Sequence, residues 1–245
     1  MKDMGKAEII KKLSEIKKMG FVPTMRVGTT GVGHTLEQLF EIAENNISLP
    51  NLKETELKAI REASNSLITL FTGDTNAWDV GGRRANGRAQ LAAIEKYGYI
   101  DKNGRGAMYH LLECNANSHG LFVAVSDNEI MIKHTDGNLI VKWDLKNVAQ
   151  KYEEKTKNIL LVSAKTCIKN DVEYFYYYRA RWCHNGIDHV NIKKLIENNK
   201  LLIDLRLHKS INNKGKGVVR NHGTALRIYE SDLADLYQTI EELSF

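Results

Sequence analysis

The spacing of apolar residues predicts a chain of alternating helices and strands. Ile9, Ile10, Leu13 and Ile16 recur at helical spacing, with lysines on the other side, which is typical of an amphipathic helix that ends near Gly20. Similar spacing predicts further helices over about 34–45, 88–96, 145–154, 189–197 and 230–243. Alternating or continuous apolar runs predict strands over 47–51, 54–60, 66–72, 106–113, 120–126, 129–134, 138–143, 159–164, 172–181 and 201–207.

These elements indicate an α/β fold. Turn residues at 126–128 and 136–138 join neighbouring strands, so the four strands between 106 and 143 are expected to form an antiparallel meander. The strand over 66–72 is apolar enough to lie in the middle of a sheet, and no internal repeat is visible. The tyrosines of the strand over 172–181 are more typical of packing than of base stacking.

Composition places the chain among ordinary globular proteins. With 245 residues, 42% hydrophobic and 27% charged, it can bury a substantial core as one large domain or two lobes. The net charge of +5 suits a polyanionic partner. We expect a cytoplasmic protein, since the N-terminus lacks an apolar signal core and no run approaches the ~20 apolar residues of a membrane span.

The cysteines Cys114, Cys167 and Cys183 are odd in number and far apart, which fits a reducing compartment better than a disulfide framework. Cys183, His184 and His189 offer metal-ligand types, but no fourth partner follows at suitable spacing. We therefore favour a structural role for these residues.

Residues 50–58 (PNLKETELK) contain the first candidates for metal-binding and catalytic side chains. In an extended chain Glu54, Glu56 and Lys58 share one face, because side chains alternate along a strand. Carboxylates hold hard divalent cations through oxygen, and a neighbouring ammonium can position or activate a water molecule. An exposed strand with alternating charges is the alternative.

A glycine-rich stretch over Gly28–Thr35 nearly satisfies the P-loop pattern. His34 stands where the phosphate-binding lysine belongs, and no buried apolar strand precedes Gly28, so nucleotide hydrolysis is the weakest alternative. The backbone amides before a helix can still hold a phosphate. On that helix, Glu37 and Glu41 lie one turn apart, either as surface acids or as contributors to a metal site.

Two basic stretches are candidates for DNA contact. No acid lies between Asp204 and Glu230, and a basic loop with two glycines is expected between Arg206 and Arg227. Its lysines suit phosphate contacts, and its arginines and histidine suit guanine edges. Arg83 and Arg84, among glycines, suit phosphate binding as well as a mobile surface loop. The candidate DNA-binding residues are Arg83, Arg84, Lys214, Lys216, Arg220, His222 and Arg227.

Several spaced segments resemble, in the same order, the MvaI/BcnI family of type II restriction endonucleases, which are monomeric relatives of the mismatch-repair nickase MutH. These segments are 31–37 (GVGHTLE), 44–49 (ENNISL), 56–58 (ELK), 66–72 (SLITLFT) and 214–228. The resemblance implies a PD-(D/E)xK mixed sheet flanked by helices, with a second DNA-recognition lobe. We expect residues 1–100 to form mainly the catalytic lobe and residues 101–245 to include the recognition lobe, with the lobes interleaved.

The family resemblance also implies an activity, which is Mg²⁺-dependent hydrolysis of a phosphodiester within a CC-x-GG type site in double-stranded DNA. Glu56 becomes the metal-binding acid, Lys58 the residue that orients or activates water, and Glu37 an accessory acid. The loop over 28–33 then lies near the scissile strand, while His222 and Arg227 read bases in the major groove. A monomer with one active site cuts one strand at a time, and a cognate DNA methyltransferase is its expected partner.

The central base pair is read, by the same resemblance, at Thr72 and Ala225. The family branch that accepts a central G·C pair resembles having histidines at these positions. Threonine and alanine resemble the branch that accepts A·T, so CCWGG is the leading site.

Asn51 departs from the family pattern, because an aspartate stands seven residues before the lysine in the family. An amide oxygen can ligate a metal ion but brings no negative charge. Asn51 and Glu56 are the expected Mg²⁺ ligands, and we expect weakened or absent cleavage. The chain is then a natural variant that works with its remaining acids, a deliberately inactivated form, or a non-hydrolytic sequence-specific DNA-binding protein on the same fold.

Overall fold

A computed structural model describes residues 4–42, 50–62, 67–73, 86–186, 189–211 and 217–245. The chain forms two compact units. The first comprises Met1–Ile68, Tyr152–Ile187 and Tyr229–Phe245, and the second comprises Thr69–Lys151 and Asp188–Ile228. The chain therefore passes between the units more than once, and the assignment of catalytic and recognition roles to lobes remains a prediction.

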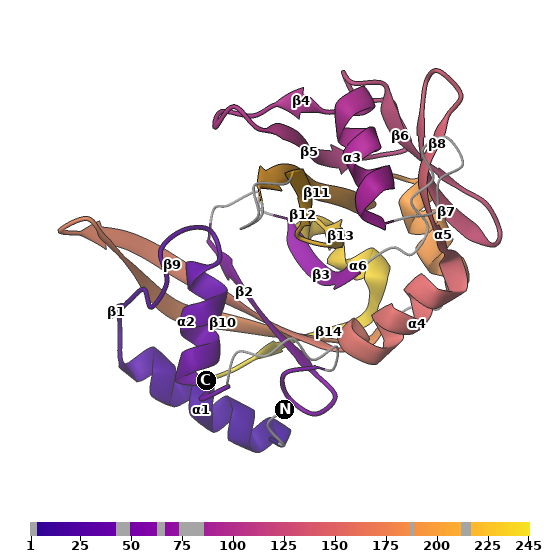
Figure 1. Cartoon of the computed structure of the whole chain (residues 1–245). Helices are drawn as coiled ribbons and strands as arrows, with labels where there is room; N and C mark the ends of the chain where they lie inside the picture. The colour runs from indigo at the N-terminus through magenta and orange to yellow at the C-terminus, as the bar shows by residue number, and fades with distance from the viewer. Residues whose placement is uncertain (1–3, 43–49, 63–66, 74–85, 187–188, 212–216) are drawn as a thin grey trace. The chain divides into compact units, whose positions relative to one another are not determined.

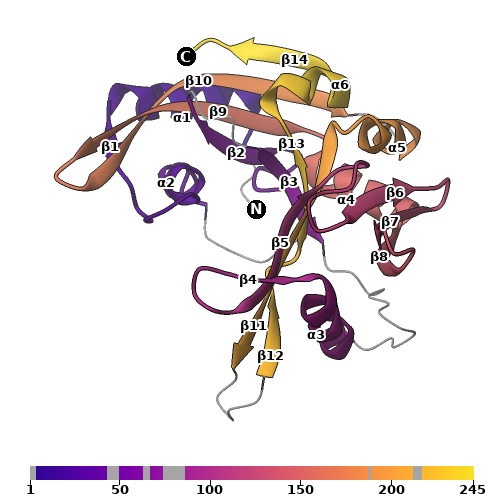
Figure 2. The ribbon, with the colours of Figure 1, turned by 90° about the horizontal axis from the view of Figure 1, so that it is seen from above.

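The first unit contains a five-stranded sheet, and two of its helices cover that sheet (Figure 1). The sheet has the order β1-β10-β9-β2, with β14 paired to β10, and only β2 and β9 pair in parallel. Its strands are β1 (Val22–Pro23), β2 (Glu56–Arg61), β9 (Ile159–Lys169), β10 (Val172–Gly186) and β14 (Tyr237–Leu243). Its helices are α1 (Lys6–Lys18), α2 (Gly31–Leu39), a 3-10 turn (Glu230–Asp232) and the short α6 (Leu233–Leu236). Figure 2 shows the long strands β9 and β10 side by side, with β1 near one end of β10.

The core of this unit lies between one sheet face and the helices α1 and α2. Leu57, Leu160 and Phe175 on the strands are buried with Leu13 and Leu36 on the helices. Burial of each such side chain contributes about 1.5–3 kcal/mol of transfer free energy. Because strand side chains alternate, the neighbours of these residues on β2 and β9 point to the opposite face.

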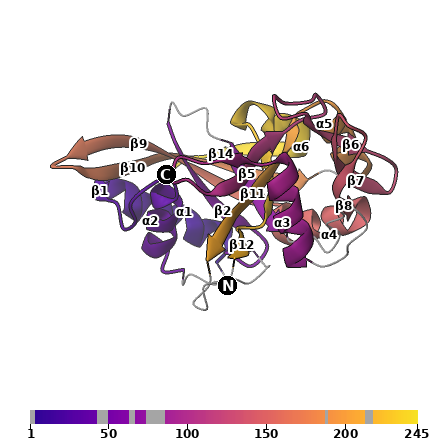
Figure 3. The same cartoon turned by 45° about the horizontal axis from the view of Figure 1, so that its top comes forward.

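The second unit contains two sheets. One has the order β3-β13-β11-β5-β4, with β12 paired to β11, and α3 packs on its β5, β11 and β12 strands (Figure 3). The other is the antiparallel meander β6-β7-β8. The strands are β3 (Ile68–Gly73), β4 (Tyr99–Ile100), β5 (Gly106–Leu112), β6 (Leu121–Val125), β7 (Glu129–His134), β8 (Leu139–Asp144), β11 (Leu201–Ile211), β12 (Gly217–Asn221) and β13 (Thr224–Ile228). The helices are α3 (Asn86–Tyr97), α4 (Leu145–Thr156) and α5 (His189–Glu197), and α4 belongs to the first unit from Tyr152 onward.

Most elements agree with the sequence-based expectations, and the predicted bounds 129–134 and 189–197 are confirmed. The predicted helix over 230–243 is wrong, because only a short helical segment precedes β14. The backbone of β14 pairs with β10 along its length, from Tyr237 opposite Gly186 to Leu243 opposite Ala180, and this pairing outweighs the helical apolar pattern.

Four smaller expectations also need correction. The strand over 66–72, expected in the middle of a sheet, corresponds to β3, which lies at the end of the described strand order beside β13. The four-stranded meander is wrong, since β5 pairs with β11 and only β6, β7 and β8 form the meander. The helix expected over 34–45 begins at Gly31 and has its last residue at Leu39. The basic loop expected between Arg206 and Arg227 is largely extended in its described part, because β11 continues to Ile211 and is followed by β12 and β13.

Cys114, Cys167 and Cys183 are free, as expected. Among the residues that the structure describes, no group of three or more His, Cys, Asp or Glu side chains is arranged to hold a metal ion. No described helix is long and apolar enough to cross a membrane.

His110 on β5 makes the stability of the second unit sensitive to pH. Its side chain is buried, and the ring of His119 lies 4.8 Å away between centroids. Burial, and secondarily the charge of His119, lowers the pKa of His110 to about 4. The unfolded chain, with a His pKa of about 6.5, therefore binds the proton more readily than the folded chain.

We expect the contribution of His110 to the free energy of unfolding to be fully present above pH 6.5 and to be lost as the pH falls toward 4. At pH 5 this loss lowers the free energy of unfolding by up to about 2 kcal/mol. Urea unfolding at several pH values measures this dependence. In His110→Gln the fall between pH 7 and pH 5 should be shallower, and an unchanged slope would contradict the role of His110.

Candidate functional site

A tight turn brings Asn51 beside Glu56 at the start of β2. Leu52 and Thr55 exchange backbone hydrogen bonds, from N–H of Leu52 to O of Thr55 at 2.9 Å and from N–H of Thr55 to O of Leu52 at 2.7 Å. The backbone N–H of Glu56 then donates to O of Asn158 at 2.9 Å, where the parallel pairing with β9 begins. Asn51 is thereby folded back onto the first residue of the strand.

The register of β2 separates its polar and apolar side chains. Leu57 and Ala59 lie opposite Leu160 and Val162 and face the core. Glu56 and Lys58 therefore lie on the other face of the sheet, as the alternation predicted. Glu54 does not join them, because it lies in the turn before the strand and is exposed.

The carboxylate of Glu56 is 6% exposed and is surrounded by hydrogen-bond donors. Its Oε1 accepts from Nζ of Lys58 at 3.0 Å, and Nζ of Lys155 lies 3.8 Å from the same oxygen. Its Oε2 accepts from the backbone N–H of Asn51 at 3.1 Å. Lys155, near the end of α4, was not among the site residues predicted from the sequence.

The side-chain amide of Asn51 also faces this carboxylate. With its nitrogen toward Glu56, the amide donates to Oε2 at 2.7 Å and to Oε1 at 3.3 Å. The opposite orientation offers one hydrogen bond, from the backbone N–H of Leu57 to Oδ1 at 3.3 Å, and sets an acceptor oxygen against the carboxylate. We assign the first orientation, because two acceptor oxygens at 2.7 Å repel each other.

These contacts do not fit a tightly held Mg²⁺ ion. Hard cations bind several oxygen ligands, with carboxylates providing most of the charge. Here Glu56 is the carboxylate, Asn51 turns donors toward it, and the ammonium groups of Lys58 and Lys155 flank it. The metal-binding role of Asn51 and Glu56 therefore stays a prediction.

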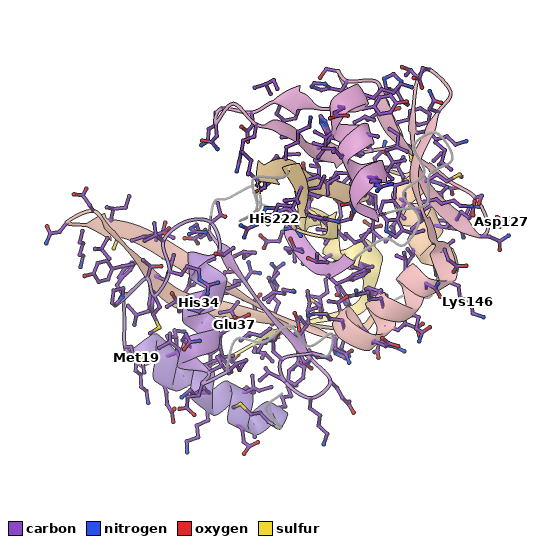
Figure 4. All side chains as sticks on the ribbon, viewed as in Figure 1. Met19, His34, Glu37, Asp127, Lys146 and His222 are labelled. Carbon is purple, nitrogen blue, oxygen red and sulfur yellow. The ribbon has the colours of Figure 1, made fainter. Side chains whose placement is uncertain are left out.

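Glu37, the predicted accessory acid, is half-buried on α2, the helix that packs beside β2 (Figure 4). Its catalytic role stays a prediction. Glu41 follows the helix with a positive φ of 58° and forms an ion pair with Lys12 at 3.3 Å. Glu41 therefore makes a structural ion pair at the end of α2.

The glycine-rich loop before α2 is held by Arg61. This guanidinium donates to O of Thr29 at 2.9 Å and to O of Gly28 at 3.1 Å, and it pairs with Glu173 at 2.7 Å. The hydroxyl of Thr35 is buried and accepts from the backbone N–H of Met25 at 2.9 Å. These contacts assign the loop a structural role and leave the ATP-binding alternative without support among the described contacts.

In the second unit, Arg206 on β11 organises the other group of candidate residues. Its Nη2 donates to Oγ1 of Thr72 and to O of His222, both at 3.1 Å, and its Nε donates to O of Gly223 at 3.1 Å. In return, the backbone N–H of His222 donates to O of Arg206 at 3.0 Å. Arg206 thus connects β3 with the turn between β12 and β13.

Arg227 and Asp204 form an ion pair on neighbouring strands, with Nη1 of Arg227 2.8 Å from Oδ2 of Asp204. Asp204 lies directly opposite Ala225, whose side chain is fully buried. Arg227 was among the predicted DNA-binding residues, whereas Asp204 and Arg206 were not. The alternation along β11, in which residues 204, 206 and 208 share a face, is the signal that could have found them.

Two histidines and a tyrosine lie close together beside Arg206. The rings of His208 and His222 stack with centroids 5.3 Å apart, and the hydroxyl of Tyr109 hydrogen-bonds to Nδ1 of His208 at 2.7 Å. Burial, followed by the charges of nearby arginines, lowers the pKa of both histidines; for His222 Arg220 is the first of these and for His208 it is Arg105. Both rings are therefore neutral at neutral pH and offer hydrogen-bonding nitrogens rather than charge.

Arg220 is exposed on β12, opposite His208. Four other predicted DNA-binding residues lie outside the described part of the chain: Arg83, Arg84, Lys214 and Lys216.

Gly223 is required by the close approach of Thr72. Its φ is +76°, and a Cβ placed on it would lie 2.2 Å from Cγ2 of Thr72. Gly104 has a similar φ of +72°, but the space around it is open. A substitution of Gly104 therefore measures the cost of the backbone conformation alone.

We expect Gly104→Ala to lower the free energy of unfolding by about 1 kcal/mol, and Gly223→Ala by roughly 2–4 kcal/mol because overpacking adds to the backbone term. Thr72→Ser combined with Gly223→Ala removes the clashing methyl and should recover most of the difference. Urea unfolding tests this, and equal losses for the two single variants would contradict the packing argument.

Known proteins share the family and the fold of this chain. The model of the MvaI/BcnI restriction endonuclease family matches residues 10–237. The restriction endonuclease MvaI in complex with its cognate DNA substrate is similar in fold, with a TM-score of 0.80 at 24% identity over 98% of this chain and 99% of that chain. MvaI in the absence of DNA has a TM-score of 0.54 at 24% identity over the full length of both chains. No curated protein sequence matches. The family match covers nearly the whole chain, and this chain therefore belongs to the MvaI/BcnI restriction endonuclease family.

Proposed function

We propose that this chain is a type II restriction endonuclease that recognises a CC-x-GG type site in double-stranded DNA, with CCWGG as the leading sequence. The observation that carries the proposal is the Glu56–Lys58 pair, held 3.0 Å apart on β2 within the segment that the family model matches. A cytoplasmic monomer that cuts one strand at a time, with a cognate DNA methyltransferase as partner, completes the proposal.

In this proposal Lys58 orients or activates the attacking water. Its ammonium donates to Glu56 with one hydrogen and has two further donors, which can hold a water molecule or a phosphate oxygen. Water attacks phosphorus in line, a new P–O bond forms, the bond to the leaving oxygen breaks, and one proton of the water ends on that oxygen. Glu37 is the proposed accessory acid. Mg²⁺ is the proposed cofactor, and the contacts around Glu56 predict that this chain holds it weakly.

Recognition is assigned to the second unit. Arg227, paired with Asp204, and His222, kept neutral by burial and nearby arginines, suit guanine and cytosine edges. Arg220 is exposed and suits either a base or a phosphate. The four basic residues Arg83, Arg84, Lys214 and Lys216 are proposed phosphate contacts. Thr72 and Ala225 remain the proposed readers of the central base pair.

A second candidate is a sequence-specific DNA-binding protein without hydrolytic activity. The amide of Asn51, which donates to both oxygens of Glu56, favours it. These hydrogen bonds occupy the lone pairs with which a carboxylate would ligate a cation. Both candidates bind the same DNA, so cleavage separates them.

A plasmid-cleavage assay tests the proposal, with and without Mg²⁺, on this chain and on Asn51→Asp. We expect cleavage by Asn51→Asp to be at least about a hundredfold faster, because the carboxylate restores charge at the site. Sequencing of the cut ends should show a CC-x-GG site. Asn51→Asp combined with Lys58→Met is the matched control and should lose activity.

Equal cleavage by this chain and Asn51→Asp would show that the other acids suffice. If neither cuts any plasmid, the endonuclease proposal fails and the binding-protein candidate replaces it.

A further inference from the structure

We propose that Lys155 is a second lysine of the active site, and that it and Lys58 together bind a phosphodiester oxygen of DNA without a divalent cation. The inference deepens the proposed function and depends on its DNA-binding part. It concerns the cluster of Asn51, Glu56, Lys58 and Lys155, all within the first unit.

Buried contacts fix the position of Lys155. The next residue, Thr156, donates through Oγ1 to O of Tyr152 at 3.3 Å, and its carbonyl accepts from the hydroxyl of Tyr237 at 2.6 Å. All three of these side chains are buried. Lys155 therefore projects from a helix end whose backbone is held by buried contacts.

The two lysines approach one carboxylate oxygen from different elements. Nζ of Lys58 and Nζ of Lys155 lie 3.0 Å and 3.8 Å from Oε1 of Glu56. Their side chains are 19% and 22% exposed, so solvent and a ligand can reach both. Each ammonium has three donors, and one carboxylate oxygen cannot use them all.

The charge of the cluster favours an anion. Glu56 contributes one negative charge, the two lysines contribute two positive charges, and Asn51 is neutral. An aspartate at position 51 would bring this sum to zero and set a second carboxylate against the incoming phosphate. With Asn51 the sum is positive, and the cluster attracts the phosphate.

Residue 51 therefore decides whether DNA binding depends on a divalent cation. In this chain the lysines neutralise the phosphate directly. In Asn51→Asp, the paired carboxylates need a cation to offset their repulsion. The predicted helix over 145–154 stopped one residue short of Lys155, and no local pattern connects that residue with β2.

Fluorescence anisotropy in EDTA tests this with a labelled duplex that contains CCWGG and one with the same bases scrambled. We expect Lys155→Met to weaken binding about tenfold, as for loss of one hydrogen bond to a charged group, and to reduce the salt slope by about 1. Lys155→Arg should retain most of the affinity. Lys146→Met, an exposed residue on the same helix (Figure 4), is the matched control and should stay within about twofold because only net charge changes.

The Asn51→Asp variant provides the second part of this binding test. In EDTA we expect it to bind about tenfold more weakly than this chain, and Ca²⁺ should restore its affinity while changing that of this chain little. Thermal unfolding of each variant separates loss of binding from loss of folding.

Two results would overturn the inference: equal affinities for Lys155→Met and Lys146→Met, or a requirement for Ca²⁺ by the unaltered chain. If the unaltered chain binds both duplexes equally, the proposed sequence-specific function itself fails.

Discussion

The parallel pairing of β2 with β9 is the constraint on which the site depends. It sets Leu57 and Ala59 into the core beneath α1 and α2, and thereby sends Glu56 and Lys58 to the opposite face. A slip of one residue would exchange these sets and bury the charges. The tight turn between Leu52 and Thr55 adds the residue at position 51 to the same face. Burial of apolar side chains thus positions the chemical groups.

Electrostatics then decide what this face can hold. Glu56 is nearly buried, and a buried carboxylate is tolerable only when donors satisfy it. Asn51, Lys58 and Lys155 supply these donors, so the carboxylate is stable without a cation. The same contacts that stabilise Glu56 reduce its capacity to ligate a metal ion. Loss of metal binding and gain of phosphate binding are, in this account, two consequences of one side chain.

Sequence alone could predict what depends on local periodicity. The alternation along β2 predicted the shared face of Glu56 and Lys58, and the structure confirms it. Local periodicity could not reveal Lys155, because that residue reaches Glu56 from a helix about a hundred positions later in the chain. Periodicity also predicted a helix over 230–243, because the pairing with β10 that makes Tyr237–Leu243 a strand is non-local. Arg206 lay near the end of the predicted strand over 201–207, and only its hydrogen bonds to Thr72 and His222 show that it organises β3 and the 222–223 turn.

Anomalous scattering from Mn²⁺ in crystals of the DNA complex tests the central claim most directly, with this chain and Asn51→Asp treated identically. The account predicts no Mn²⁺ peak at the Glu56 carboxylate in this chain, a phosphate oxygen within hydrogen-bonding distance of the lysine ammonium groups, and a Mn²⁺ peak beside Glu56 in Asn51→Asp. An ion bound by Asn51 and Glu56 in the unaltered chain would contradict it.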